Sequence, residues 1–156
     1  MSRAAFRAIA FVLAVFGFVS ALRAQPTTND TATGSGLTAY LGIMPAEIVK
    51  GHPSIHPEGA MHGGPPSGAH EYHVVVAIFD TASGARVSDA TVMAKVSGLG
   101  LSGPEKKLEP MIIANTVTYG GFFELTADLY TVRVTVKRPG AQAPVVLDFR
   151  YDHRSQ

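Results

Sequence analysis

Histidine is the residue type whose placement in this sequence most clearly suggests chemistry. The chain has six histidines, and five of them fall in a short window where a uniform distribution would place fewer than one. These five are His52, His56, His62, His70 and His73. Imidazole nitrogen binds copper, zinc, iron and nickel near neutral pH. The cluster therefore predicts a transition-metal site, and the alternative is a structural or incidental role in a polar loop.

Methionine sulfur could complete such a site. Met61 stands beside His62, Met111 follows Pro110, and a thioether adds preference for cuprous copper. The chain has no cysteine, which excludes a disulfide framework, a thiolate metal site and a cysteine nucleophile. A soft-metal site would therefore use histidine and methionine. The candidate ligands are His62, His70, His73 and Met111, with Met61, His52 and His56 as a looser outer set.

The sequence offers little support for catalysis. It contains no G-x-S-x-G elbow, no S-x-x-K motif and no glycine-rich phosphate loop that opens a helix. The histidine spacings also match no helical H-x-x-x-H or H-E-x-x-H template, because the one four-residue spacing, His52 to His56, lies in a stretch too rich in glycine and proline for a helix. We therefore expect a metal-binding protein and not an enzyme. The alternative function is a non-catalytic envelope interaction or structural module whose histidines are incidental.

The first residues have the order of a secretory signal. Arg3 and Arg7 precede the apolar stretch from Ala8 to Ala21, and a short tail ends at Ala24. An apolar helix of this length would span about 21 Å, less than the roughly 30 Å hydrocarbon core of a bilayer, so cleavage is favoured over anchoring. We expect a signal peptide over residues 1–24, a periplasmic or secreted mature protein, and no membrane insertion after cleavage.

Charge argues against a nucleic-acid partner. The whole chain carries a net charge of +1, but three of its arginines lie in the expected signal peptide. The remainder has ten basic and twelve acidic residues, a net charge of −2. A nucleic-acid-binding domain needs a basic surface, and this one has no excess of positive charge.

Before residue 70, the sequence contains only weak signals for the helices or strands that would position these residues. Residues 25–36 are polar and predict a flexible leader. Residues 37–69 are expected to be irregular, with a short strand and one helical turn separated by Pro45. Glycine or proline occupies nine of the twenty positions from Lys50 to Ala69, which predicts a loop. Met44, beside Pro45, is expected in the core.

Residues 70–156 predict a β-sandwich domain. Glu71 to Asp80 is apolar on both faces, as expected of a central strand. Leu129 to Lys137 and Val145 to His153 alternate apolar and polar residues, and we expect them to pair. Further short strands with turns about ten residues apart bring the total to about seven. The sequence therefore predicts an all-β, single antiparallel immunoglobulin-like sandwich, with a small closed barrel as the other option.

One stretch resembles a known family. Pro110-Met111 is followed, after seven residues, by Tyr119-Gly120. This spacing resembles the P-M-x7-Y-G signature of the periplasmic immunoglobulin-like metal-binding proteins that accompany high-affinity ferrous iron permeases. The resemblance loosely covers Glu71 to Tyr151. It implies a copper or iron ion as cargo and an envelope or inner-membrane metal transport protein as partner. The segment T-A-S-G-A-R-V-S-D-A-T-V also looks like exported sandwich domains of the YtkA-like kind.

The resemblance also implies a ligand set, which this chain matches in part. In the family the signature methionine is a ligand, and a histidine precedes the Tyr-Gly pair. Met111 matches the methionine, whereas Thr118 stands at the histidine position. The family's H-x-E pair falls near His70 and His73, and its histidine near the last strand has no counterpart over residues 137–144. Either the histidine-rich loop supplies replacement ligands, or the chain keeps the scaffold without the site.

Overall fold

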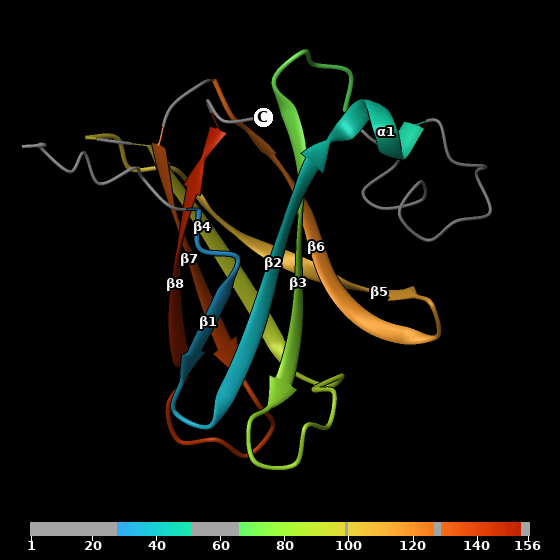
Figure 1. Cartoon of the computed structure of the whole chain (residues 1–156), viewed down its shortest axis with the longest axis vertical. Coiled ribbons are helices and arrows are strands. Elements are labelled where there is room, and N and C mark those ends of the chain that lie inside the picture. The colour runs from blue at the N-terminus through green and yellow to red at the C-terminus, as the bar shows by residue number, and fades with distance from the viewer. Residues whose placement is uncertain (1–27, 51–65, 99, 127–128, 154–156) are drawn as a thin grey trace, which may run out of the picture.

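Eight antiparallel strands and one short helix make up the described part of the chain, which is residues 28–50, 66–98, 100–126 and 129–153 of a computed structural model (Figure 1). The elements are β1 (Thr31–Gly34), β2 (Leu37–Pro45), α1 (Ala46–Lys50), β3 (Glu71–Asp80), β4 (Thr91–Gly98), β5 (Glu105–Ile113), β6 (Thr116–Glu124), β7 (Leu129–Lys137) and β8 (Val145–Asp152). The expected signal peptide and the loop residues 51–65 lie outside the described residues. No described helix is long and apolar enough to cross a bilayer.

The strands follow the order β1-β2-β3-β6-β5-β4-β7-β8 and fold into two layers. β5 belongs to both layers, because residues 105–108 pair with β4 and residues 109–113 pair with β6. Figure 1 shows β5 crossing from the β4 side of the molecule to the hairpin that it forms with β6. At the other edge, Asn29 forms an isolated bridge with Arg150 of β8. The predicted immunoglobulin-like sandwich is confirmed, and it is nearly closed into a barrel.

Alternation along the strands directs one face of each layer into the main core. On β3, the side chains of Val74, Val76 and Ile78 are fully buried. On β7, Val132 and Val134 face them from the other layer and are buried as well. The strictly alternating strands at the C-terminal end, β7 and β8, pair as the sequence predicts. The main core therefore lies between the layers. It is made of the residues that the alternation of apolar and polar side chains predicted to face inward.

The sandwich begins earlier in the chain than expected. The structure places β1 within the expected leader and β2 within the expected irregular segment, and β2 pairs with β3 along its length. Leu37 and Ala39 fill the main core, which explains why this segment is extended. Gly42 and Pro45 weaken the strand pattern in the sequence. The helical turn after Pro45 is present as α1.

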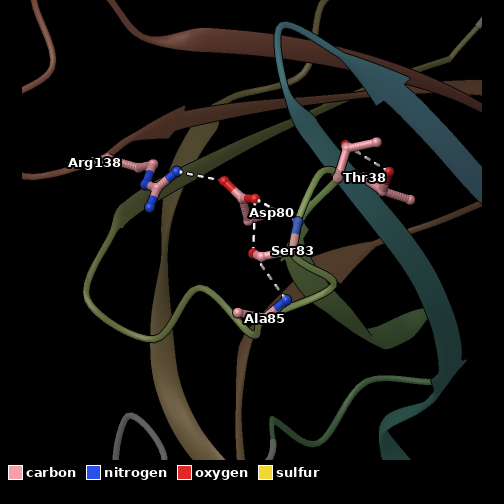
Figure 2. Close-up of polar contacts among 6 residues, drawn as sticks. Thr38, Asp80, Ser83, Ala85 and Arg138 are labelled. Atoms are coloured by element: carbon pink, nitrogen blue, oxygen red, sulfur yellow. Dashed lines mark hydrogen bonds and ion pairs between the residues drawn. The ribbon is translucent and has the colours of Figure 1, made fainter.

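Polar contacts fix the turns at the end of the sandwich where β3 finishes (Figure 2). Asp80 accepts hydrogen bonds from the backbone N–H and the hydroxyl of Ser83, at 3.0 and 2.8 Å. Arg138, just after β7, donates to the other carboxylate oxygen at 3.1 Å. These hydrogen bonds, that from the Ser83 backbone first, lower the pKa of Asp80. The network ties the β3–β4 turn to the β7–β8 turn.

Candidate metal centre

A second, smaller apolar cluster lies on the outer face of the β2-β3-β6-β5 layer, opposite the main core. Three of its residues are buried and three are partly buried against them. We call this the outer cluster: Ala46, Met111 and Phe122, with Met44, Val75 and Ile113. The sequence signal for the outer cluster is that β3 is apolar on both faces. Its odd-numbered residues point away from the main core, so other apolar side chains must cover them.

His73 lies on the same outer face. It is fully buried on β3, with Met44 and Phe122 as its register partners on the neighbouring strands. Its ring stacks on Phe122 at a centroid distance of 4.8 Å and an interplanar angle of 28°. Stacking and burial restrict the rotation of the imidazole. This histidine is therefore held in a fixed orientation.

Gly120 on β6 provides the space in which His73 and Met111 meet. A Cβ atom at this position would lie 2.7 Å from Nε2 of His73 and would overlap Cε of Met111. The imidazole nitrogen and the thioether methyl therefore converge on one point above Gly120, and the sulfur is one bond from that methyl. We call this space the Gly120 cradle. Imidazole and thioether together form a soft donor pair, suited to copper(I).

The hairpin of β5 and β6 brings the residues of the Pro-Met and Tyr-Gly motif together. Its register pairs Pro110 with Tyr119, Met111 with Thr118, and Glu109 with Gly120. Met111 lies on the outer face of the layer, but only 3% of it is exposed, because its neighbours in the outer cluster cover it.

Tyr119 of this motif has a structural role. Its hydroxyl donates to the carbonyl of Val87 at 3.3 Å and accepts from the N–H of Ala90 at 3.1 Å. Burial raises its pKa, so the phenol stays neutral. At the position of the family's histidine, the hydroxyl of Thr118 accepts a hydrogen bond from Arg86 at 3.2 Å. The tyrosine thus anchors β6 to the β3–β4 connection, while the glycine after it forms the cradle.

An open depression of about 550 Å³ adjoins the outer cluster. Its lining includes Glu71, Lys106, Lys107, Glu109 and Phe122. Glu71 precedes His73 by two residues and Glu109 precedes Met111 by two, so alternation places both carboxylates on the outer face. Lys107 lies 3.5 Å from Glu109. The depression beside the outer cluster is therefore lined by groups of both charges.

The structure brings two of the predicted ligands together, His73 and Met111. His70 is exposed in the turn before β3, where its carbonyl accepts a hydrogen bond from the N–H of Leu125 at 2.8 Å. Met44, expected in the core, instead packs in the outer cluster. Four predicted ligands lie outside the described residues: His52, His56, Met61 and His62. Within the described ranges, no group of three or more histidine, aspartate or glutamate side chains is placed to hold a metal ion.

The sequence analysis gave no spatial role to two residues beside the candidate site. Gly120 was named only as part of the Tyr-Gly motif, and Glu109 was not singled out. The link between them is the register of the β5–β6 hairpin. For Glu109 the available signal was its two-residue spacing from Met111, which puts both on one face of a strand.

These features define a class of protein, an immunoglobulin-like sandwich with an imidazole and a thioether close together on the outer face of one layer. No protein-family model matches the sequence, and no curated protein matches it. Solved structures do match. Copper-reconstituted P19 of Campylobacter jejuni is 11% identical, with a TM-score of 0.60 over 80% of this chain and 92% of P19.

Two further matches have a similar extent. FetP of uropathogenic Escherichia coli strain F11 is 14% identical, with a TM-score of 0.58 over 80% of this chain and 94% of FetP. A DUF4426 family protein of Pseudomonas aeruginosa PAO1 is 11% identical, with a TM-score of 0.53 over 79% of this chain and 94% of that protein. A variant of FetP has also been solved with copper bound. At these identities the likeness establishes a shared fold.

Proposed function

We propose that this protein is an exported, non-catalytic metal-binding accessory or chaperone-like protein. Copper(I) is its first cargo and ferrous iron its second. The observation that carries the proposal is the convergence of His73 Nε2 and Met111 above Gly120. An imidazole and a thioether are donors that copper(I) prefers, whereas ferrous iron accepts harder oxygen and nitrogen ligands. Copper is also bound in the solved structures of P19 and of a FetP variant, which share this fold.

The proposed ligands differ in what supports them. His73 and Met111 are supported by the structure, because their side chains meet in the Gly120 cradle. His62 and His70, and the looser outer set of His52, His56 and Met61, come from the sequence alone. All five of these residues lie in the segment between α1 and β3.

The proposed location is the periplasm, with secretion as the second possibility. The order of charged, apolar and small residues at the N-terminus supports export. FetP, which shares the fold, was recombinantly expressed in the periplasm of E. coli. The proposed partner is an envelope or inner-membrane metal transport protein that exchanges the ion with this one. The proposal includes no nucleic acid and no catalytic step.

Metal competition on the purified, tag-free mature protein tests the proposal. Copper(I), copper(II), iron(II) and zinc(II) would be titrated against chelators of known affinity under controlled redox conditions. We expect one copper(I) ion per chain to bind most tightly. His73→Leu and Met111→Leu should each lower copper(I) affinity by at least about tenfold, because each removes one donor while keeping an apolar side chain in its place.

His153→Leu is the matched control. The ring of His153 contacts Tyr72, and its Nδ1 lies 3.4 Å from the hydroxyl of Tyr151, away from the outer cluster. This variant should bind copper(I) as the wild type does. Circular dichroism would confirm that all three variants fold. Wild-type affinity no greater than that of an unstructured histidine-containing peptide would overturn the proposal and favour an interaction module.

A further inference from the structure

Glu109 is the donor-bearing side chain that lies directly beside the Gly120 cradle. In the β5–β6 ladder it is the register partner of Gly120. Directly opposed residues of antiparallel strands point to the same face, with Cβ positions about 4.5–5.5 Å apart. A glutamate carboxylate can therefore reach the point above Gly120 from the β5 side. Met44 also carries a thioether sulfur, but it lies on β2, which β3 separates from β6 and from the Gly120 cradle.

Glu109 also lines the open depression, beside Phe122. Its side chain is partly exposed, whereas His73 and Met111 are buried. An ion in this depression would meet the Glu109 carboxylate, and the register of Glu109 with Gly120 places that residue next to the two buried donors. In the structure the carboxylate is 3.5 Å from the ammonium group of Lys107. An exposed ion pair of this kind is weak, so it can be given up for a metal ion.

We propose that Glu109 is a third ligand of the site and the residue that sets its selectivity among metal ions. The inference rests on the proposed function and adds an oxygen donor to it. Carboxylate oxygen is a hard ligand and favours copper(II) and iron(II), while thioether sulfur favours copper(I). A site with one imidazole, one thioether and one carboxylate can hold copper in both oxidation states. Lys107 is the resting partner of the carboxylate when no ion is bound.

The test compares two substitutions that should separate the metals. Glu109→Gln keeps the size of the side chain and removes the charge and the strong oxygen donor. We expect it to lower affinity for copper(II) and iron(II) by at least about tenfold and to leave copper(I) affinity within about threefold of the wild type. Met111→Leu should show the opposite order, with the larger loss for copper(I).

A spectroscopic readout separates ligation from a general charge effect. Copper(II) bound to Glu109→Gln should give altered electron paramagnetic resonance hyperfine values, because an oxygen ligand has been lost. Glu105→Gln is the matched control on the same strand, in the half of β5 that pairs with β4. It removes the same charge and should change neither the spectrum nor the order of affinities. Lys107→Met should raise copper(II) affinity by freeing the carboxylate.

The outcomes distinguish the two proposals. If the wild type binds none of the four ions tightly, the proposed function fails. If binding depends on His73 and Met111 but Glu109→Gln alters neither copper(II) affinity nor the spectrum, this inference fails and the proposed function stands. Equal effects of Glu105→Gln and Glu109→Gln would likewise overturn it, because they would reflect net charge alone.

Discussion

At the scale of single residues, the candidate site depends on position 120 being a glycine, which has no side chain. Gly120 lies between His73 on one neighbouring strand and Met111 on the other, and both use the volume that a Cβ atom would fill. Any larger residue would separate the nitrogen from the sulfur. The following residue, Gly121, faces the main core, where an added Cβ would lie 3.0 Å from Leu108. Gly120 thus leaves space on the outer face of the layer, whereas Gly121 leaves space on the face that packs in the main core.

Gly120→Ala should therefore damage binding more than folding. We expect copper(I) affinity to fall by at least about tenfold, since the added methyl pushes Met111 and His73 apart. Gly121→Ala is the control, and it should lose about 1–3 kcal/mol of unfolding free energy through overpacking while keeping its copper(I) affinity. Copper(I) competition and urea unfolding measure the two effects. A Gly120→Ala variant that binds copper(I) as tightly as the wild type would contradict the role of the cradle.

The sequence identified His73 and Met111 as separate candidates but could not show that they meet. Residue type and local composition point to chemistry, whereas the distance between two side chains depends on strand pairing over 38 positions of sequence. Thr118 illustrates the limit. It stands where the family that the sequence resembles has a histidine, and only the strand register shows that Glu109 lies opposite Gly120, next to that position.

At the scale of elements, the β5–β6 hairpin sets the geometry of the site. Its two-residue turn consists of Ala114 and Asn115, which have φ angles of 49° and 62°. Positive φ at both central residues is the mark of a type I′ turn, whose twist matches the flanking strands. This turn fixes the register that places Glu109 opposite Gly120. Alanine is a poor residue for such a conformation, because its Cβ crowds the backbone.

Replacing Ala114-Asn115 by Asn-Gly should stabilise the protein by up to about 1 kcal/mol, because these residues adopt positive φ more readily. Copper(I) affinity should stay the same, since the register is kept. Urea unfolding and copper(I) competition would be measured on the double variant. A loss of stability, or a change in affinity, would show that the native turn has a different role.

The elements themselves were largely predictable from the sequence, because hydrophobic alternation is local. The strictly alternating residues of β7 and β8 face the core as expected, and β3 is central. The start of the sandwich was not recovered, since β2 contains Gly42 and ends at Pro45, which interrupt its pattern. The crossing of β5 from one layer to the other also has no local signal beyond Pro110.

At the scale of the whole molecule, ion pairs join strands and turns at the surface. Arg133 of β7 donates two hydrogen bonds to Asp148 of β8, at 2.8 and 3.0 Å, and these lower the pKa of Asp148. The pKa of Asp80 is lowered in the same way, first by its hydrogen bonds from Ser83 and then by that from Arg138. Both carboxylates stay ionised in the folded protein at a pH where the unfolded chain binds protons. Their contribution to stability is therefore present above the unfolded pKa and is lost as pH falls through the folded pKa.

Asp80→Asn should lower the thermal unfolding temperature at neutral pH, because it removes the negative charge that faces Arg138 and replaces one of the two acceptor oxygens with an NH2 group that cannot accept. It should also flatten the loss of stability below about pH 4, near the reference pKa of aspartate. Thermal unfolding followed by circular dichroism from acidic to neutral pH would measure both effects. Asp89→Asn, at an exposed position, is the control and should retain the wild-type profile. An unchanged acid profile in Asp80→Asn would show that other groups govern acid unfolding.

The alternation of β3 and β6 has a consequence for how such a protein can diverge. Even-numbered residues of β3 build the main core, while odd-numbered residues such as His73 lie on the outer face, so the two sets share a backbone and no side-chain space. Substitutions on the outer face can therefore accumulate without creating cavities in the main core. Outer-face positions such as Thr118 and Glu109 can change in residue type while the sandwich remains stable. A common fold at very low sequence identity is what this separation permits.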